Sequence, residues 1–350
     1  MQVNKTTLIA LLLIIVLIMM SLFWTIWWWV WWIASMLLLI IWWFYVLVVW
    51  WDQLVSGAWS IAQHYKISPF IIWMSILAFG TSLPELFVNI IAAVRWESSL
   101  LIANVIWSNL SNLLLIWWVT AIIAKIRISK STLFKEIPLS FLATLLLLIL
   151  LHLWVQNWAV AILSQWKAWI LLLWFILFIR QLINAAQNDE IEVETDIPKL
   201  TLKQAFLSII WWIVWLYIWW EALVTYATLL AESLWVSTIL IWASIIAFGT
   251  SVPELVTSII AALKKNTDMA IWNIIWSNIF NILWIVWVTW LIQPIKADRW
   301  LFTDITVLLI VTLFLFLIIG IKKKKELKAR EWVVFIILYW IYLFFLFYRW

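Results

Sequence analysis

The sequence predicts an all-α polytopic membrane protein, and two observations lead to this fold class. Of its 350 residues, 68% are hydrophobic and only 11% are charged. Apolar runs of about 18 residues or more recur along the whole chain, which is the length a helix needs to cross a bilayer. A β-barrel would show alternating segments of roughly ten residues instead of continuous apolar blocks.

The apolar runs predict ten helices in two sets of five, preceded by an extra helix at 7–24. The first set is 34–62, 69–94, 99–124, 132–154 and 158–183, and the second is 204–231, 237–263, 269–292, 303–321 and 331–348. The chain then divides into an N-terminal helix and loop (1–33), a first repeat (34–183), an acidic cytoplasmic linker (184–203) and a second repeat (204–350). The first run could be a cleaved signal peptide, but it is long for one and lacks a small-residue cleavage site, so we favour a retained helix. The acidic linker lacks the ligand spacing of an EF-hand loop, so we expect a solvated segment.

The two sets are copies of each other. AFGTSLPEL (78–86) matches AFGTSVPEL (247–255), and WSNLSN (107–112) matches WSNIFN (276–281), both at an offset of 169 residues. Without gaps, 19 of the 35 residues in 78–112 are identical to those in 247–281. This is an internal duplication.

Five helices are an odd number, so the second copy should cross the membrane in the opposite sense. Placing the N-terminus and the segments 63–68, 125–135, 180–203, 264–268 and 322–330 in the cytoplasm puts 17 of the 22 Lys and Arg residues there. That distribution satisfies the positive-inside rule. Inverted repeats with a site near the bilayer midplane are typical of secondary transporters.

The repeated motif carries a set of oxygen ligands. Ala78, Thr81, Ser82 and Glu85 share one helical face, because they are spaced i, i+3, i+4 and i+7. Pro84 lacks an amide hydrogen and should break the helix, which frees main-chain carbonyls around 78–81. The second copy repeats this arrangement with Ala247, Thr250, Ser251, Glu254 and Pro253. Such hard oxygen ligands suit Ca²⁺ or Na⁺.

Two carboxylates inside a bilayer need a physical reason, since each costs at least about 2.5–3.5 kcal/mol at mid-membrane. If Glu85 and Glu254 meet across a pseudo-two-fold axis, their formal charge of −2 is neutralised by a divalent cation. Without that cation the like charges repel, which links its release to the binding of protons or monovalent cations. The alternative, in which these polar residues only join helices, is disfavoured because the motif is duplicated with proline at the same offset.

A polar stripe follows each motif. Asn104, Ser108 and Asn112 are spaced i, i+4 and i+8, as are Asn273, Ser277 and Asn281. This spacing places each set on one face of an apolar helix, which suggests a lined site.

GTSLPEL with SNLSN, and GTSVPEL with SNIFN, resemble the two α-repeats of the sodium/calcium exchanger membrane-domain family, within the cation/Ca²⁺ exchanger superfamily. The resemblance covers roughly 34–348 and implies a ten-helix inverted-repeat fold that exchanges Ca²⁺ against Na⁺ by alternating access, with K⁺ or H⁺ involved in some branches. The ligands that it implies are the carboxylates of Glu85 and Glu254, groups of Thr81, Ser82, Thr250 and Ser251, the carbonyls of Ala78 and Ala247, and the side chains of Ser108, Asn112, Ser277 and Asn281.

The chain departs from the family pattern in two ways. Several branches carry aspartate at the positions of Asn112 and Asn281, so only two acids remain here, which weakens an assignment of K⁺ dependence or of three Na⁺ per cycle. Tryptophan also replaces glycine at family positions: Trp73, Trp107, Trp242, Trp272, Trp276 and Trp287.

Glycine is scarce throughout, with 4 residues against 37 tryptophans, where an average of about 7% predicts about 25 glycines. Trp in place of Gly should pack poorly in the helices 69–94, 99–124, 237–263 and 269–292. Some bacteria read the UGA codon as glycine, so we predict glycine at these positions in the natural protein; a deliberately substituted sequence is the alternative.

The sequence thus predicts a Ca²⁺/Na⁺ (or Ca²⁺/H⁺) antiporter. A passive cation channel and an H⁺-coupled exchanger without Na⁺ dependence are the alternatives. No nucleophile–base set, phosphate loop or HExxH motif occurs, so we expect neither an enzyme nor a cofactor. The basic residues are confined to short loops, which disfavours nucleic acid as a partner. We expect a monomer in the lipid bilayer, a multi-pass protein of a cell membrane and specifically of a bacterial inner membrane.

Overall fold

The structure is a computed structural model, and it describes residues 27–39, 41–42, 45, 56–57, 60–61, 64, 78–96, 98–129, 132–152, 160–188, 200–234, 246–263, 267–321, 326–327 and 329–349. The helix predicted at 7–24 and most of the one predicted at 34–62 lie outside these residues. A helix at Trp27–Leu39 is described near the start of the chain, so the loop predicted before residue 34 is wrong from Trp27 onward.

The described part of the chain is almost entirely helical. The first half contains α3 (Ala78–Thr81), α4 (Leu83–Val94), α5 (Ser98–Ser111), the π-helix η2 (Asn112–Ile116), α6 (Trp117–Ile123), the π-helix η3 (Thr132–Glu136), α7 (Ile137–His152) and α8 (Gln165–Asn188). The second half contains α9 (Leu202–Leu234), α11 (Ala247–Thr250), α12 (Val252–Leu263), α13 (Thr267–Phe280), the π-helix η5 (Asn281–Ile285), α14 (Val286–Ile292), α15 (Arg299–Ile321) and α16 (Ala329–Arg349). Five of the described helical stretches are long and apolar enough to cross a membrane. The predicted all-α membrane fold is confirmed.

Two short antiparallel strand pairs close the ends of the helix bundle. β1 (Ile126–Arg127) pairs with β4 (Glu326–Leu327), and β2 (Val160–Leu163) pairs with β3 (Ile295–Asp298). The predicted helix at 158–183 is therefore wrong over 160–163. Short apolar runs fit a strand as well as a helix, and here Ala161 and Leu163 are buried while Ile162 is half exposed.

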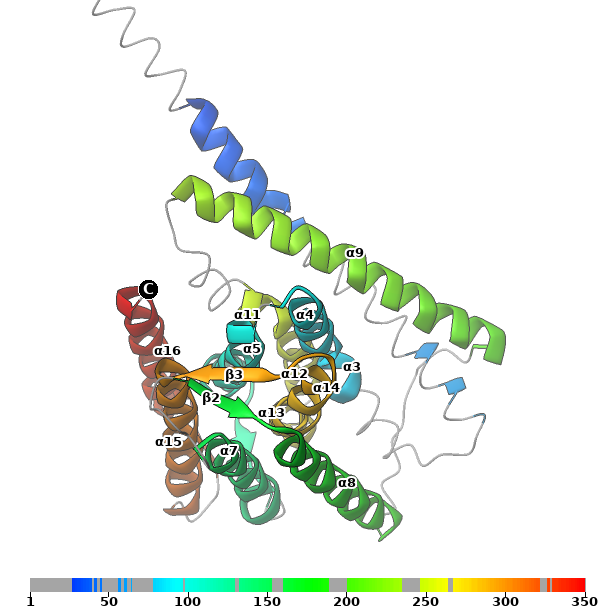
Figure 1. Cartoon of the computed structure of the whole chain (residues 1–350). Coiled ribbons are helices and arrows are strands. Elements are labelled where there is room, and N and C mark those ends of the chain that lie inside the picture. Colours follow the sequence, from blue (N-terminus) through cyan, green and yellow to red (C-terminus); the bar gives the residue numbers. More distant parts are fainter. Residues whose placement is uncertain are drawn as a thin grey trace, which may run out of the picture.

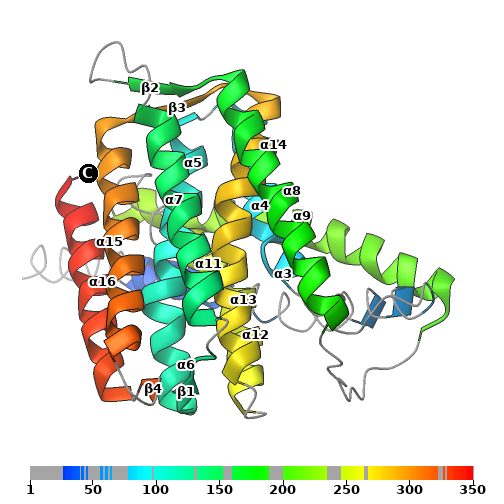
Figure 2. The same cartoon turned by 90° about the horizontal axis from the view of Figure 1, so that it is seen from below.

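The strands show that the two halves run in opposite directions. An offset of 169 relates β1 to the first residues of β3, yet these two strands lie at opposite ends of the bundle (Figure 2). The β1–β4 end carries segments that the charge distribution assigns to the cytoplasm. The β2–β3 end carries Lys296 and Arg299, which the same distribution places outside.

The centre of the bundle is formed by α5 with η2 and by α13 with η5. In an 18-residue apolar window, 89% is buried within Leu100–Ile123 and 72% within Ala270–Ile292, whereas only 28% is buried in Trp332–Arg349. The long helix α9 lies beside this bundle, where it contacts α4. Its axis runs across the direction of the bundle helices (Figures 1 and 2). The backbone of α9 lies close to Gly57, because a Cβ added at Gly57 would lie 2.8 Å from the carbonyl oxygen of Ala205.

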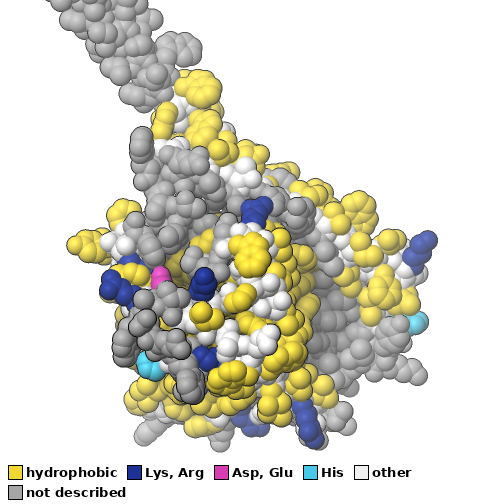
Figure 3. Space-filling view, in the orientation of Figure 1, with side chains coloured by type: hydrophobic (Ala, Val, Ile, Leu, Met, Phe, Trp, Pro, Cys, Tyr) yellow, Lys and Arg dark blue, Asp and Glu magenta, His cyan; other side chains and the backbone are white. Residues whose placement is uncertain are grey.

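The outward faces of the peripheral helices are apolar, which suits contact with lipid. Leu173 on α8, Ile310 on α15 and Phe344 on α16 are all exposed. Apolar side chains cover much of the visible described surface (Figure 3).

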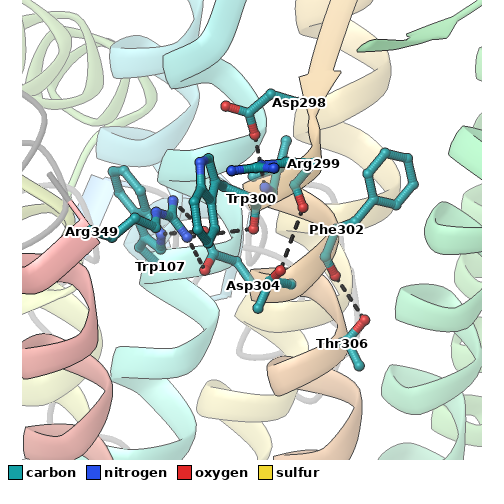
Figure 4. A network of polar contacts seen from close by, with 10 residues as sticks. Trp107, Asp298, Arg299, Trp300, Phe302, Asp304, Thr306 and Arg349 are labelled. Carbon is teal, nitrogen blue, oxygen red and sulfur yellow. Dashed lines mark hydrogen bonds and ion pairs between the residues drawn. The ribbon is translucent and has the colours of Figure 1, made fainter. Parts of the chain in front are cut away.

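A buried ion pair joins α16 to α15 (Figure 4). The guanidinium of Arg349 contacts both carboxylate oxygens of Asp304, at 2.9 and 3.1 Å. Trp107 Nε1 on α5 donates to the same carboxylate at 3.2 Å. Asp304 has no exposed surface, so these partners are what keep its charge compatible with the interior.

The tryptophans at two family glycine positions are buried, Trp107 with 3% of its surface exposed and Trp276 with 2%. Trp276 stacks on Trp272, with ring centroids 4.6 Å apart. The helices thus fit around the indoles, but several buried indole N–H groups have no hydrogen-bond partner among the described residues: those of Trp117, Trp276, Trp284, Trp287 and Trp332. Each unpaired buried donor costs about 1–3 kcal/mol. Glycine at the six family positions in the natural protein stays a prediction.

Replacing Arg349 with methionine should lower the thermal stability of the detergent-solubilised protein. The change leaves Asp304 buried without its cation, which costs about 3–5 kcal/mol. The double variant Asp304→Leu, Arg349→Met removes both charges and should recover most of the loss. A single variant as stable as the parent would contradict this account of the ion pair.

The mass of the intact protein purified from its natural source tests the tryptophan assignment. Glycine at these positions gives a mass clearly below the 41.7 kDa of the printed sequence. A mass that matches all 37 tryptophans would refute the prediction.

Candidate cation-binding site

The site is built on two interrupted helices, one in each half. α3 ends at Thr81, and α4 begins at Leu83 with Pro84 in its first turn. Between them Ser82 has φ −87° and ψ 6°, outside helical values, and Ser251 between α11 and α12 has φ −84° and ψ 4°. Proline removes an amide donor and displaces the preceding turn. The interruption predicted from Pro84 and Pro253 therefore lies at these two serines.

The interruptions bring the two carboxyl groups together. Ser82 Oγ donates to Glu254 Oε1 at 3.2 Å, and Ser251 Oγ donates to Glu85 Oε1 at 3.3 Å. Each glutamate is therefore held by a serine of the other half. Neither has exposed surface, and the two carboxyl groups interact electrostatically.

Hydroxyl groups from the following helices surround this centre. Thr81 Oγ1 lies 3.3 Å from Ser277 Oγ, and Thr250 Oγ1 lies 3.3 Å from Ser108 Oγ. The carbonyl oxygen of Ala247 accepts from Thr250 at 3.1 Å and from Ser108 at 3.5 Å. The Thr81–Ser277, Thr250–Ser108 and Ser108–Ala247 contacts also cross between the halves.

Two asparagines at the starts of the π-helices complete the oxygen set. Asn112 Nδ2 donates to Asn278 Oδ1 at 2.9 Å, and Asn281 Nδ2 donates to Asn109 Oδ1 at 3.0 Å. One oxygen of each glutamate and of each of these asparagines then lacks a hydrogen-bond donor among the described residues: Glu85 Oε2, Glu254 Oε2, Asn112 Oδ1 and Asn281 Oδ1. All four belong to groups that coordinate Ca²⁺ in proteins. A bound cation would offset the cost of burying them unpaired.

The predicted polar stripes differ between the halves. Asn273 lies at the site, because it accepts from Thr81 Oγ1 and donates to the carbonyl of Glu254, both at 3.4 Å. Its counterpart Asn104 instead donates to Asn89 Oδ1 at 2.9 Å. The position equivalent to Asn89 in the second half is a serine, Ser258, so the longer amide accounts for the difference.

Eleven of the twelve predicted ligand residues have described side chains, and these are buried in this region: Thr81, Ser82, Glu85, Ser108, Asn112, Ala247, Thr250, Ser251, Glu254, Ser277 and Asn281. Ala78 forms the first residue of α3, and nothing is described of its side chain. No group of three or more His, Cys, Asp or Glu side chains that could hold a metal occurs in the described ranges. The acidic charge here comes from two glutamates.

Sequence reasoning missed Asn109 and Asn278, which contact Asn112 and Asn281. Each follows the stripe serine by one residue, so helical periodicity places it off the predicted face. Their presence in both copies of the SN motif was the available signal.

Comparison with known proteins adds independent evidence. The family model described as sodium/calcium exchanger protein matches residues 35–183 and 204–348. A putative antiporter, CaxA of Alkalimonas amylolytica, is 35% identical over 254 residues, covering 71% of this chain and 77% of that protein. The inner membrane protein YrbG of Escherichia coli is 30% identical over 269 residues, covering 75% and 82%.

The fold also matches a solved structure. A structure of the sodium-calcium exchanger NCX_Mj superposes with a TM-score of 0.65 and 26% identity, covering 88% of this chain and 98% of that one. With family matches over both halves and a shared fold, the chain belongs to the sodium/calcium exchanger family.

Proposed function

We propose that this protein exchanges Ca²⁺ for Na⁺ across a membrane, with Glu85 and Glu254 as the central ligands. The observation that carries the proposal is the crossed pair of Ser–Glu hydrogen bonds, which holds two buried carboxyl groups from opposite halves together. When both are ionised their charge is −2, which one Ca²⁺ or two monovalent cations can neutralise. Because these cations compete for the same oxygens, binding of one favours release of the other.

The ligand set proposed for the cation consists of oxygens alone. The four unpaired oxygens of Glu85, Glu254, Asn112 and Asn281 form its core. Hydroxyls of Thr81, Ser82, Ser108, Thr250, Ser251 and Ser277 and the carbonyls of Ala78 and Ala247 are the further candidates. Hard oxygen donors suit Ca²⁺ and Na⁺ and exclude soft-metal chemistry.

Alternating access is supported by the opposed directions of the two halves. Each half contributes one interrupted helix, and the two interruptions meet at the glutamates. Rocking of one half against the other around a fixed site is the usual mechanism of inverted-repeat transporters. A passive channel would need no such paired interruptions.

The apolar outer faces support a position in the lipid bilayer, and we propose a monomer without enzymatic activity. One relative is named an inner membrane protein, which supports the bacterial inner membrane as the location. Protons are the alternative counter-ion, because carboxylates can also be neutralised by protonation.

In membrane vesicles, Glu85→Gln and Glu254→Gln should each abolish gradient-driven Ca²⁺ uptake. Each change removes half of the negative charge while preserving the shape of the side chain. Glu136→Gln in η3, the same substitution outside the site, is the matched control and should transport normally. Full uptake by either site variant would remove these glutamates from the mechanism.

Varying Na⁺ and H⁺ gradients separately identifies the counter-ion. We expect Ca²⁺ uptake into Na⁺-loaded vesicles when external Na⁺ is low, at equal pH on both sides. Uptake driven by a pH gradient alone would identify an H⁺-coupled exchanger. Uptake that ignores both gradients would identify a channel.

A further inference from the structure

Asn109 and Asn278 form a reciprocal amide contact between α5 and α13. Asn109 Nδ2 donates to the main-chain carbonyl of Asn278 at 3.1 Å, and Asn278 Nδ2 donates to the main-chain carbonyl of Asn109 at 3.3 Å. Both side chains are buried, with at most 1% of their surface exposed. A main-chain carbonyl can only accept a hydrogen bond. These two contacts therefore fix which end of each amide is the nitrogen.

The orientation of these two amides also determines the orientation of the amides of Asn112 and Asn281. Since the nitrogens of Asn109 and Asn278 face main-chain carbonyls, their Oδ1 atoms face the other way and accept from Asn281 and Asn112 at 3.0 and 2.9 Å. The NH₂ groups of Asn112 and Asn281 are thereby engaged. Their Oδ1 atoms remain, buried and without a donor among the described residues.

We propose that Asn109 and Asn278 are positioning residues that hold Asn112 and Asn281 with their amide oxygens turned to the transported cation. The inference rests on the proposed function, because a cation is what those oxygens would bind. An asparagine amide can rotate to present either its oxygen or its NH₂. Only the oxygen can coordinate Ca²⁺ or Na⁺, so an unlocked amide loses a ligand whenever it rotates.

The same four hydrogen bonds also limit the charge that the side chains at positions 112 and 281 can carry. An ionised aspartate at position 112 would place a carboxylate oxygen against Asn278 Oδ1, and two acceptors would face each other, whereas a protonated, neutral one could still donate. Asn278 cannot rotate to relieve this contact without turning its own oxygen onto the carbonyl of Asn109. The arrangement thus selects neutral oxygen ligands at positions 112 and 281, and it leaves the negative charge on Glu85 and Glu254.

Equilibrium Ca²⁺ binding to the purified full-length protein tests the proposal, with Ca²⁺ alone as the probe. Asn278→Ala frees the amide of Asn112, and we expect the Kd for Ca²⁺ to rise about tenfold, the scale set by losing one buried hydrogen bond. Asn112→Ala should weaken binding by a similar factor. The double variant should be no weaker than Asn112→Ala, because a positioning residue acts only through its partner.

The matched control is Ser111→Ala. Ser111 precedes Asn112, is similarly buried, and shares a hydrogen bond with Tyr339 of α16 and not with any of these asparagines. We expect its Kd to match that of the parent. In vesicles, Asn278→Ala should raise the KM for Ca²⁺ and largely preserve the rate per folded molecule at saturating Ca²⁺, a split that general misfolding does not produce.

Asn112→Asp provides a second measurement that does not depend on the folding of Asn278→Ala. If Asn278 positions residue 112, Asn112→Asp should bind Ca²⁺ more weakly despite the added negative charge. Tighter binding would overturn the proposal. Parental affinity in Asn278→Ala, or losses that multiply in the double variant, would also overturn it while leaving the proposed function intact. A parent protein that binds no Ca²⁺ would overturn both proposals.

Discussion

The structure depends on keeping two carboxyl groups inside an apolar helix bundle. Glu85 and Glu254 have no exposed surface, and each accepts a hydrogen bond from a serine of the opposite half. The serine that reaches across is the residue at which the helix is interrupted, three residues before the glutamate of its own half and two before the proline. The broken helices therefore supply the serines that stabilise the two buried acids, and the same contacts join the two halves.

Duplication makes this arrangement nearly symmetric. Exchanging equivalent residues, whose numbers differ by 169, converts the Ser82–Glu254 contact into Ser251–Glu85 and converts the Asn112–Asn278 contact into Asn281–Asn109. The exception is Asn104, which bonds to Asn89 in the first half, whereas Asn273 bonds around Glu254. The environments of the two glutamates therefore differ, and the halves also differ at the position that carries Asn89 in one and Ser258 in the other.

Sequence reasoning reached the fold class, the duplicated motif and the position of the helix breaks, because each is encoded by apolar length, residue identity or proline. It missed features that need a partner distant in sequence. The strand at 160–163 depends on β3, and the burial of Asp304 depends on Arg349. Sequence reasoning also missed Asn109 and Asn278, because they make contacts between the halves and do not lie on a helical stripe. The π-helices that begin at Asn112 and Asn281 had no sequence signal that we recognised.

The two kinds of polar contact at the site suggest which parts stay fixed during exchange. The hydrogen bonds among the four asparagines of α5–η2 and α13–η5 run from 2.9 to 3.3 Å and form a closed reciprocal set in the most buried part of the bundle. The side-chain hydroxyl contacts that α3, α11 and the serines following them make across the two halves run from 3.2 to 3.4 Å, and in two of them either hydroxyl could be the donor. Longer contacts of hydroxyls that can rotate are easier to exchange for a cation than an interlocked amide set. Entry and release should therefore displace the interrupted helices, while the asparagines keep their oxygens in place.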